Sequence, residues 1–236
     1  MIGFIPSELD HPLRILALGA HCDDIEIGAG ATLLRLLRER GASLCVVIAA
    51  SDDTREREAR ESVAAFARAS GWKANAEIHF GSFKENVLPD SATAVRELVL
   101  THGRTFAPDV VFCPHLADRH QDHRVMAECA HQLFRDHPIF EYEIAKYDGD
   151  LHTPNVYCGV TEADATMKVS SIEEHFASQR GRTWFDPEAF LSLMRVRGIE
   201  CNERYAEGFH VRKLVVMASD GSVATPPGER SRKDDR

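Results

Sequence analysis

The feature that most constrains the fold is a regular alternation of short apolar runs with amphipathic stretches over the first 135 residues. Apolar runs of strand length lie at residues 15–20, 44–50, 76–80 and 110–113. Apolar residues at helical spacing lie at residues 28–40, 55–69, 92–102 and 125–135. Strands that alternate with helices form a mainly parallel sheet with helices on both faces. The sequence therefore predicts an α/β fold, whose ligands bind at the carboxyl ends of the strands.

The pattern changes after residue 139. Strands are predicted at 140–144, 155–160 and 211–217, and helices around 167–177 and 187–194. Because no linker separates these segments from the rest, we expect C-terminal elements that cap the site within one catalytic domain, residues 1–218. Residues 219–236 combine Pro, Gly and mixed charges, which predicts a disordered tail.

Composition excludes several classes of protein. Acidic residues outnumber basic ones by 37 to 28, so binding to nucleic acid lacks its usual electrostatic driving force. No apolar stretch could span a membrane and the first residues do not resemble a signal peptide, so we expect a cytoplasmic protein. The six cysteines include no Cys-x-x-Cys pair, which indicates reduced, mostly buried thiols. The number of subunits stays open, a homo-oligomer included.

The first polar motif, Ala20-His21-Cys22-Asp23-Asp24-Ile25-Glu26, follows an apolar strand directly. A tight turn could bring His21 and Asp24 onto one metal ion, at zinc distances of about 2.0 to 2.2 Å. Asp23 would then be free to act as general base and acid beside the ion. Glu26 could favour the start of the next helix or support the site. Taken alone, however, this spacing is more often a helix cap beside a surface histidine.

The same loop also has a weak resemblance to a nucleotide-binding turn. Gly28-Ala29-Gly30 follows a strand and opens a helix, and Asp52 and Asp53 follow the next strand, where a ribose-binding acid could lie. The third glycine of that pattern is absent, because Leu33 occupies its place. Close packing of the helix on the sheet is therefore the better explanation of the two glycines.

The second polar motif, residues 114–123, follows the strand at 110–113 and holds three histidines and two aspartates. This density of ligand-type side chains indicates function rather than packing. Catalytic zinc usually takes three protein ligands, and His123 is the natural third. His120 would then stabilise an oxyanion and Asp122 would orient an imidazole. Spacing alone also allows His120 as the ligand and His123 as the helper.

The two motifs resemble the signatures of the PIG-L/LmbE-like deacetylases. The first signature corresponds to Ala20–Glu26 with Gly28 and Gly30-Ala31-Thr32-Leu33, and the second to His120-Gln121-Asp122-His123. The chain differs from the usual Ala-His-Pro-Asp-Asp-Glu, since Cys22 replaces proline and Glu26 lies one residue further on. The resemblance extends over residues 14–214. It includes Phe140–Ile144, Lys168, His175–Gln179 and Tyr205–Phe209.

This resemblance implies a Rossmann-like sheet, a catalytic metal and a reaction. The implied metal ligands are His21, Asp24 and His123. The implied catalytic residues are Asp23 as general base and acid, and His120 with Asp122 as the pair that stabilises the oxyanion. The implied reaction is hydrolysis of an N-acetyl group from a glucosamine-type sugar or its conjugate. Zinc is the expected ion, although two nitrogens and one carboxylate also suit non-haem iron.

Candidate substrate contacts come from predicted loops and from stretches that resemble the family. They are Arg55, Glu85, Lys146, His175, Gln179 and Tyr205. Each is explained equally well as an ordinary polar residue, and the charged run 52–61 is most simply a solvated helix face. Two other functions stay as alternatives: a metal-dependent hydrolase of another bond, and a non-catalytic nucleotide- or sugar-binding module. A two-metal phosphohydrolase would need more bridging carboxylates than Asp118 and Asp122.

Overall fold

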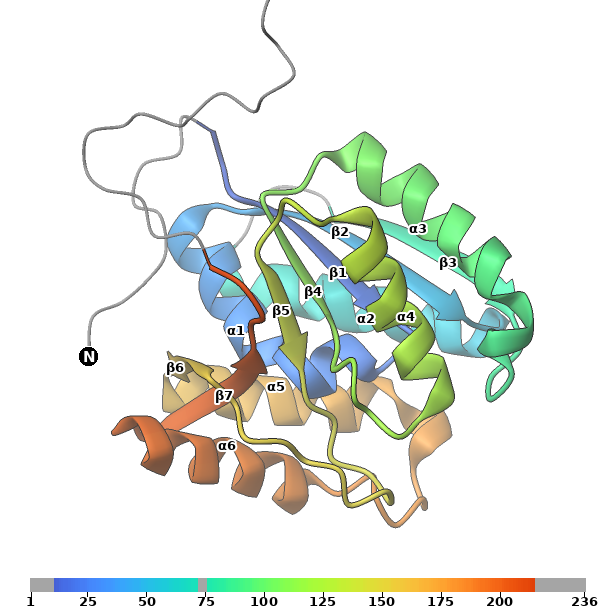
Figure 1. Cartoon of the computed structure of the whole chain (residues 1–236). Helices are drawn as coiled ribbons and strands as arrows, with labels where there is room; N and C mark the ends of the chain where they lie inside the picture. The colour runs from blue at the N-terminus through green and yellow to red at the C-terminus, as the bar shows by residue number, and fades with distance from the viewer. Residues whose placement is uncertain (1–10, 72–75, 215–236) are drawn as a thin grey trace, which may run out of the picture.

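The computed structural model describes residues 11–71 and 76–214, and at its centre lies a seven-stranded sheet in the order β3-β2-β1-β4-β5-β7-β6 (Figure 1). The strands are β1 (Arg14–Gly19), β2 (Ser43–Ala50), β3 (Glu77–Phe83), β4 (Val110–Pro114), β5 (Ile139–Tyr142), β6 (Val156–Val160) and β7 (Tyr205–His210). The α-helices are α1 (Asp24–Arg40), α2 (Asp53–Ser70), α3 (Ala92–Phe106), α4 (Gln121–Leu133), α5 (Glu162–His175) and α6 (Pro187–Cys201). Two short 3-10 helices are η1 (Leu88–Ser91) and η2 (Ala177–Gln179).

The first five strands of the chain pair in parallel, which confirms the predicted α/β fold. β1 pairs with β2 on one side and with β4 on the other. The strand order therefore reverses between β1 and β4, as in Rossmann-like sheets, and ligands bind at such switch points. Each polar motif directly follows one of these two strands, so the topology alone brings the motifs together.

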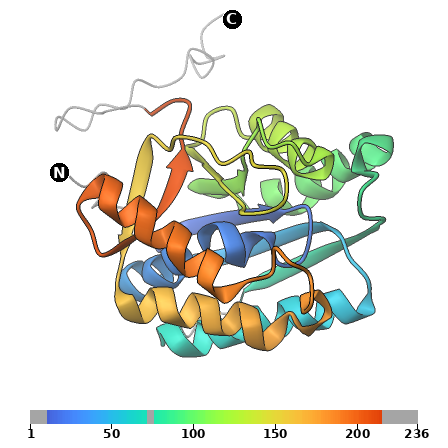
Figure 2. The same ribbon diagram turned by 90° about the horizontal axis from the view of Figure 1, so that it is seen from below.

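Helices cover both faces of the sheet (Figure 2). Alternate residues of β1 point to opposite faces, because side chains alternate along a strand. Ile15 and Ala17 pack in one buried cluster with residues of α1, α2, α5 and α6. Leu16 and Leu18 pack in another with residues of α3 and α4. The result is a three-layer arrangement with its apolar cores on either side of the sheet.

The C-terminal elements complete the sheet and the outer layer. β7 pairs antiparallel with β5 and with β6, and α5 packs against both α1 and α2. The predicted strand at 211–217 is wrong: β7 ends at His210, residues 211–214 are irregular, and residues 215–217 lie outside the described part of the chain. The predicted tail, 219–236, lies outside it too. No helix of residues 11–71 and 76–214 is long and apolar enough to cross a membrane.

The two helices that follow the polar motifs begin one turn earlier than their apolar periodicity predicts. α1 begins at Asp24 and α4 at Gln121, four residues before the expected starts at 28 and 125 in each case. The extra turns carry polar residues, which is why hydrophobic spacing alone did not detect them. As a consequence, Asp24 and His123 both lie in the first turn of a helix.

Candidate metal centre

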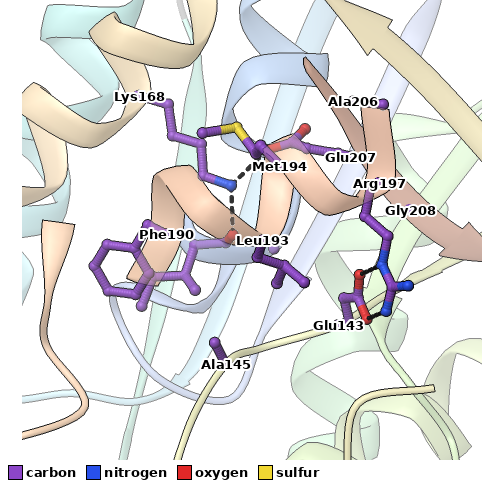
Figure 3. Close-up of a pocket in the computed structure, with 12 residues that line it drawn as sticks. Glu143, Ala145, Lys168, Phe190, Leu193, Met194, Arg197, Ala206, Glu207 and Gly208 are labelled. Carbon is purple, nitrogen blue, oxygen red and sulfur yellow. Dashed lines mark hydrogen bonds and ion pairs between the residues drawn. The ribbon is translucent and has the colours of Figure 1, made fainter. Parts of the chain in front are cut away.

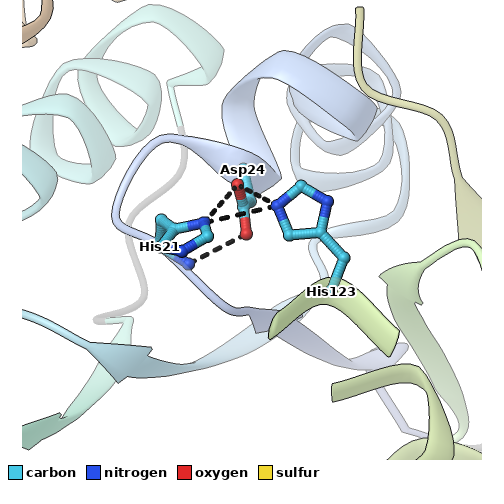
Figure 4. Close-up of side chains that lie close together, drawn as sticks. All are labelled: His21, Asp24 and His123. Carbon is cyan, nitrogen blue, oxygen red and sulfur yellow. Dashed lines mark hydrogen bonds and ion pairs between the residues drawn. The ribbon is translucent and has the colours of Figure 1, made fainter. Parts of the chain in front are cut away.

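Three ligand-type atoms from the two motifs face one another beyond the ends of β1 and β4 (Figure 4). Asp24 Oδ1 lies 3.5 Å from His21 Nδ1 and 3.3 Å from His123 Nε2. The two imidazole nitrogens are 3.3 Å apart. These separations match atoms that share one ion at about 2 Å each. The structure thus brings together the three residues predicted as ligands.

Asp24 is oriented by the backbone of its own loop. The N–H groups of Ala20 and His21 donate to its Oδ2 at 2.8 and 2.9 Å, which leaves Oδ1 to face the histidines. These contacts reach back toward β1 rather than forward into α1. Asp24 therefore does not cap the helix, and Asp23, at the N-cap position, makes no side-chain capping bond either. The helix-cap interpretation of the motif is wrong.

A carboxylate orients each imidazole from behind. His21 Nε2 lies 3.1 Å from Asp122 Oδ2, and His123 Nδ1 lies 2.9 Å from Asp118 Oδ2. A ring nitrogen that donates its proton to a carboxylate leaves the other nitrogen as a free lone pair, as in the histidines of metal sites. In both residues the nitrogen left free is the one that faces Asp24 Oδ1.

The charges around the three atoms favour a cation between them. Burial alone would lower the pKa of both imidazoles, but neighbouring carboxylates outweigh it. Asp24 and Asp122 raise the pKa of His21 to about 10, and Asp24 and Asp118 raise that of His123 to about 9. The two histidines hold the pKa of Asp24 well below its usual range against the effect of burial. A divalent cation could replace these protons, and two nitrogens with one carboxylate oxygen fit zinc or iron(II).

Asp23 has one carboxylate oxygen without a partner, and its negative charge acts on the neighbouring His21 of the cluster. Its Oδ1 accepts a bond from Arg55 Nη2 at 2.8 Å. Its Oδ2 is buried, and no described residue bonds to it. Buried polar atoms are usually paired, so an orphaned carboxylate oxygen calls for an explanation such as a water or substrate proton. Such an oxygen is what a general base next to a metal requires.

Arg55 belongs to a buried polar network rather than to a solvated helix face. Arg55 and Glu58 are 5% and 6% exposed, so the solvated-face prediction is wrong for this inner side of α2. Arg55 Nη1 lies 3.1 Å from Ser178 Oγ, which donates to Glu58 at 2.7 Å. Gln179 Nε2 also donates to that hydroxyl at 3.0 Å. The network connects α2 and η2 to Asp23, so Arg55 orients the carboxylate of Asp23.

His120 borders the cluster and has defined hydrogen-bond roles. Its Nδ1 accepts the Asp122 N–H at 3.2 Å, which assigns the ring proton to Nε2, 3.2 Å from Asn86 Oδ1. The Asp122 carboxylate contacts His21 instead, and also accepts the N–H groups of Asn86 and Leu88. A side-chain pairing of His120 with Asp122 is therefore not observed. The role of His120 at an oxyanion stays a prediction.

The alternative ligand set shares His21 with the first. Ligand atoms of His21, His120 and Asp122 also lie within reach of one another. In that set, however, both carboxylate oxygens of Asp122 already accept backbone N–H groups. His120 Nδ1 is occupied by the Asp122 N–H as well. The contacts therefore favour His21, Asp24 and His123.

The other predicted substrate contacts differ in position. Lys146 Nζ bonds to Asp118 at 2.9 Å and to Asp150 at 2.8 Å, so two carboxylates neutralise it. Glu85 is half-buried in the β3–η1 loop, and its negative charge helps to raise the pKa of Arg55.

His175 and Tyr205 lie on C-terminal elements. His175 is the half-buried last residue of α5. Tyr205 is buried in an apolar cluster with Ala31, Val160 and Met194. The structure does not bring Tyr205 to the three ligand atoms.

The remaining residues of the first motif pack inward. Cys22 lies in the apolar cluster of α1 and α2, where burial raises the pKa of its thiol. Burial also raises the pKa of Glu26 to about 8. A Cβ on Gly28 would lie 2.1 Å from Tyr142 of β5, which confirms close packing of the helix on the sheet. All six cysteines are free, and all but Cys158 are buried.

Three residues of the site were not among the predicted ones. Asp118 orients His123, Asn86 contacts both His120 and Asp122, and Glu58 holds Ser178 and Arg55. Asp118 alone had a signal, as an extra carboxylate in the second motif. The others lie in ordinary stretches of sequence, and only the fold brings them to the site.

Comparison with known proteins agrees with this geometry. The PIG-L family model, described as GlcNAc-PI de-N-acetylase, matches residues 16–134, which contain both motifs. A protein of Escherichia coli strain K12, named uncharacterized deacetylase YaiS, is 28% identical over 174 residues. The similarity covers 68% of this chain and 89% of that protein.

Solved structures share the fold. The conserved protein TT1542 from Thermus thermophilus aligns with a TM-score of 0.66 at 22% identity, covering 87% of this chain and 97% of that one. The N,N'-diacetylchitobiose deacetylase from Pyrococcus horikoshii aligns with a TM-score of 0.65 at 23% identity, covering 85% and 84%. Because the family model spans half of the sequence and every residue of the three-atom cluster, we conclude that this chain belongs to the PIG-L family.

Proposed function

We propose that the protein is a metal-dependent deacetylase that hydrolyses the N-acetyl group of a glucosamine-type sugar or its conjugate. The observation that carries the proposal is the unpartnered Oδ2 of Asp23 beside the three convergent atoms of His21, Asp24 and His123. Family membership and relatives named as deacetylases support the reaction class. Zinc is the proposed ion, held by the two imidazole nitrogens and the Asp24 oxygen.

The residues divide the work of amide hydrolysis among them. A divalent cation would supply Lewis acidity to the amide carbonyl and to the attacking water. Asp23 Oδ2 accepts the proton of that water, while the Arg55 guanidinium holds the other oxygen in place. The same carboxyl group then returns the proton to the departing amine, so that water and amide become acetate and a free amino sugar. His120 Nε2–H contacts Asn86 Oδ1 in the structure, and during the reaction it donates to the developing oxyanion instead.

The sugar class rests on the relatives, whereas the amide chemistry rests on the site. One ion with a single free carboxylate suits acyl transfer to water. A two-metal phosphohydrolase needs bridging carboxylates, and here the Asp118 and Asp122 oxygens already contact imidazoles and N–H groups. The non-catalytic binding module stays the alternative that the experiment must exclude.

The test is acetate release from a panel of N-acetylglucosamine conjugates by the purified, zinc-loaded protein and by Asp23→Asn. We expect release by the wild type and a loss of about 10²-fold or more in the variant, because a general base contributes about 10² to 10⁴. Zinc binding by Asp23→Asn should be unchanged, since Asp23 is not a ligand. Equal release by both proteins would exclude the assigned base.

Metal stoichiometry needs one control. Cys45, Glu77 and His79 also have ligand atoms within reach of one another at the β2–β3 edge. Zinc content is therefore measured in Cys45→Ala as well as in His123→Ala. We expect loss of the ion only in His123→Ala. Stoichiometric zinc without release from any conjugate would favour the binding module or another hydrolysable bond.

A further inference from the structure

A buried ion pair from the C-terminal elements contacts the backbone of helix α1, a few residues after the motif that contains Asp23 and Asp24. Lys168 of α5 and Glu207 of β7 are both 3% exposed, and Lys168 Nζ lies 2.6 Å from Glu207 Oε1 (Figure 3). The pair lies in the lining of a small pocket with Gly28 of α1 and Met194 of α6. Neither charge belongs to the site described above.

Both charged groups bond to the backbone of α1. Lys168 Nζ donates to the Ile27 carbonyl at 2.6 Å. Glu207 accepts the N–H groups of Ala31 and Thr32 at 3.1 and 2.7 Å. In an uninterrupted α-helix the Ala31 N–H pairs with the Ile27 carbonyl. Here each of these two groups also bonds to a charged side chain, so the ion pair lies alongside this rung of the helix.

The ion pair bonds to α1 just after the first turn of this helix, which is continuous from Asp24 to Arg40. The first turn is closed by the Ile27 N–H bond to the Asp23 carbonyl at 3.0 Å, and it carries Asp24. Its last carbonyl, on Ile27, is the one that Lys168 bonds. Lys168 also packs closely against Gly30, where an added Cβ would lie 3.3 Å from Lys168 Cγ. The turn that carries both carboxylates is therefore held from outside the helix.

The energetics indicate a role in position rather than in stability. Burial of two opposite charges costs desolvation, and an apolar pair of similar volume is often as stable or more so. A buried pair that bonds to the Ile27 carbonyl and to the N–H groups of Ala31 and Thr32 instead fixes the geometry of this part of α1. We propose that Lys168 and Glu207 are positioning residues that orient the first turn of α1, and with it the Asp24 carboxylate, for metal binding. This inference rests on the proposed metal centre.

The test measures zinc affinity by competition with a chromophoric chelator, in the full-length protein. We expect Lys168→Met and Glu207→Gln to bind zinc about tenfold or more weakly than wild type, the lower end for residues that support ligands indirectly. Lys168→Arg, which keeps a cationic donor, should recover part of the loss. Glu207→Gln keeps the shape of the side chain and carries the test if Lys168→Met does not fold.

Arg197→Met is the matched control. Arg197 forms a second buried ion pair, with Glu143, that lines the same pocket, and its hydrogen bonds go to Glu143, Glu200 and His152 rather than to α1. It should lose unfolding free energy in urea while its zinc affinity stays at the wild-type value. If folded Lys168→Met and Glu207→Gln also bind zinc like wild type, the positioning role is excluded. If wild type itself binds no zinc, the metal centre fails instead, so the two failures are distinguishable.

Discussion

Glu141 should give the protein a pH-dependent stability that one substitution removes. Its side chain is fully buried on β5 and accepts bonds from the Leu116 N–H, His131 and Arg212 at 2.8, 2.9 and 2.7 Å. Burial alone would raise the pKa of Glu141, but these partners outweigh it and lower the value from 4.5 to about 2. At 1.36 kcal/mol per unit, the ionised group stabilises the folded state by about 3 kcal/mol.

The direction in which stability changes with pH follows from the lowered pKa of Glu141. The unfolded chain binds a proton near pH 4.5 and the folded chain only near pH 2, so the stabilisation is complete above pH 5 and is lost as the pH falls toward 2. Near pH 3 the unfolded state holds about 0.9 more protons, which gives a slope of about 1.2 kcal/mol per pH unit. The contribution should thus fall from about 3 kcal/mol at pH 7 to about 1.4 at pH 3.

The assay is urea unfolding of wild type and Glu141→Gln between pH 3 and 7, with a chelator present so that metal binding does not contribute. The difference in unfolding free energy should shrink as the pH falls. Glu39→Gln is the matched control, because Glu39 forms an exposed ion pair with Arg35 and should change stability by less than about 1 kcal/mol at any pH. A difference between wild type and Glu141→Gln that stays constant over this range would refute an ionised, buried Glu141.

Three further substitutions test the site and its support. Gly28→Ala should lower the unfolding free energy by about 2 kcal/mol in urea, since overlap with the buried Tyr142 ring outweighs the gain of about 1 kcal/mol in helix propensity; a stabilised variant would contradict the packing. Asp118→Asn should weaken zinc binding about 10- to 100-fold in chelator competition, because His123 loses its orienting carboxylate, and an unchanged affinity would exclude that role. Arg55→Met should cost about 3 to 5 kcal/mol of unfolding free energy by calorimetry and urea, whereas a loss below about 1 kcal/mol would mean that its buried carboxylates relax.

The sequence predicted the parts of the site that local chemistry marks. His21, Asp24 and His123 follow apolar strands directly, and the carboxyl ends of neighbouring parallel strands meet, so their convergence could be expected. The residue that orients each imidazole could not be predicted from sequence spacing. Asp122 proved to support His21, a residue 101 positions away, rather than its neighbour His120.

Charged residues in buried places were the main source of error. Arg55 and Glu58 have the spacing of a solvated ion pair, but in the fold both are buried beside Ser178 of η2 and Arg55 also lies over the Phe176 ring. The strand β7 was missed because Glu207 interrupts its apolar pattern. The partners of that buried carboxylate lie on α1 and α5, far away in sequence. No local sequence pattern indicates that its charge is paired there.

The most direct test of the metal centre is anomalous diffraction at the zinc edge from crystals grown with zinc. We expect a peak within about 2.2 Å of His21 Nδ1, Asp24 Oδ1 and His123 Nε2, with Asp23 Oδ2 not bound to the ion. A peak on His120 and Asp122 instead, or none at either group while zinc binds elsewhere on the protein, would contradict it.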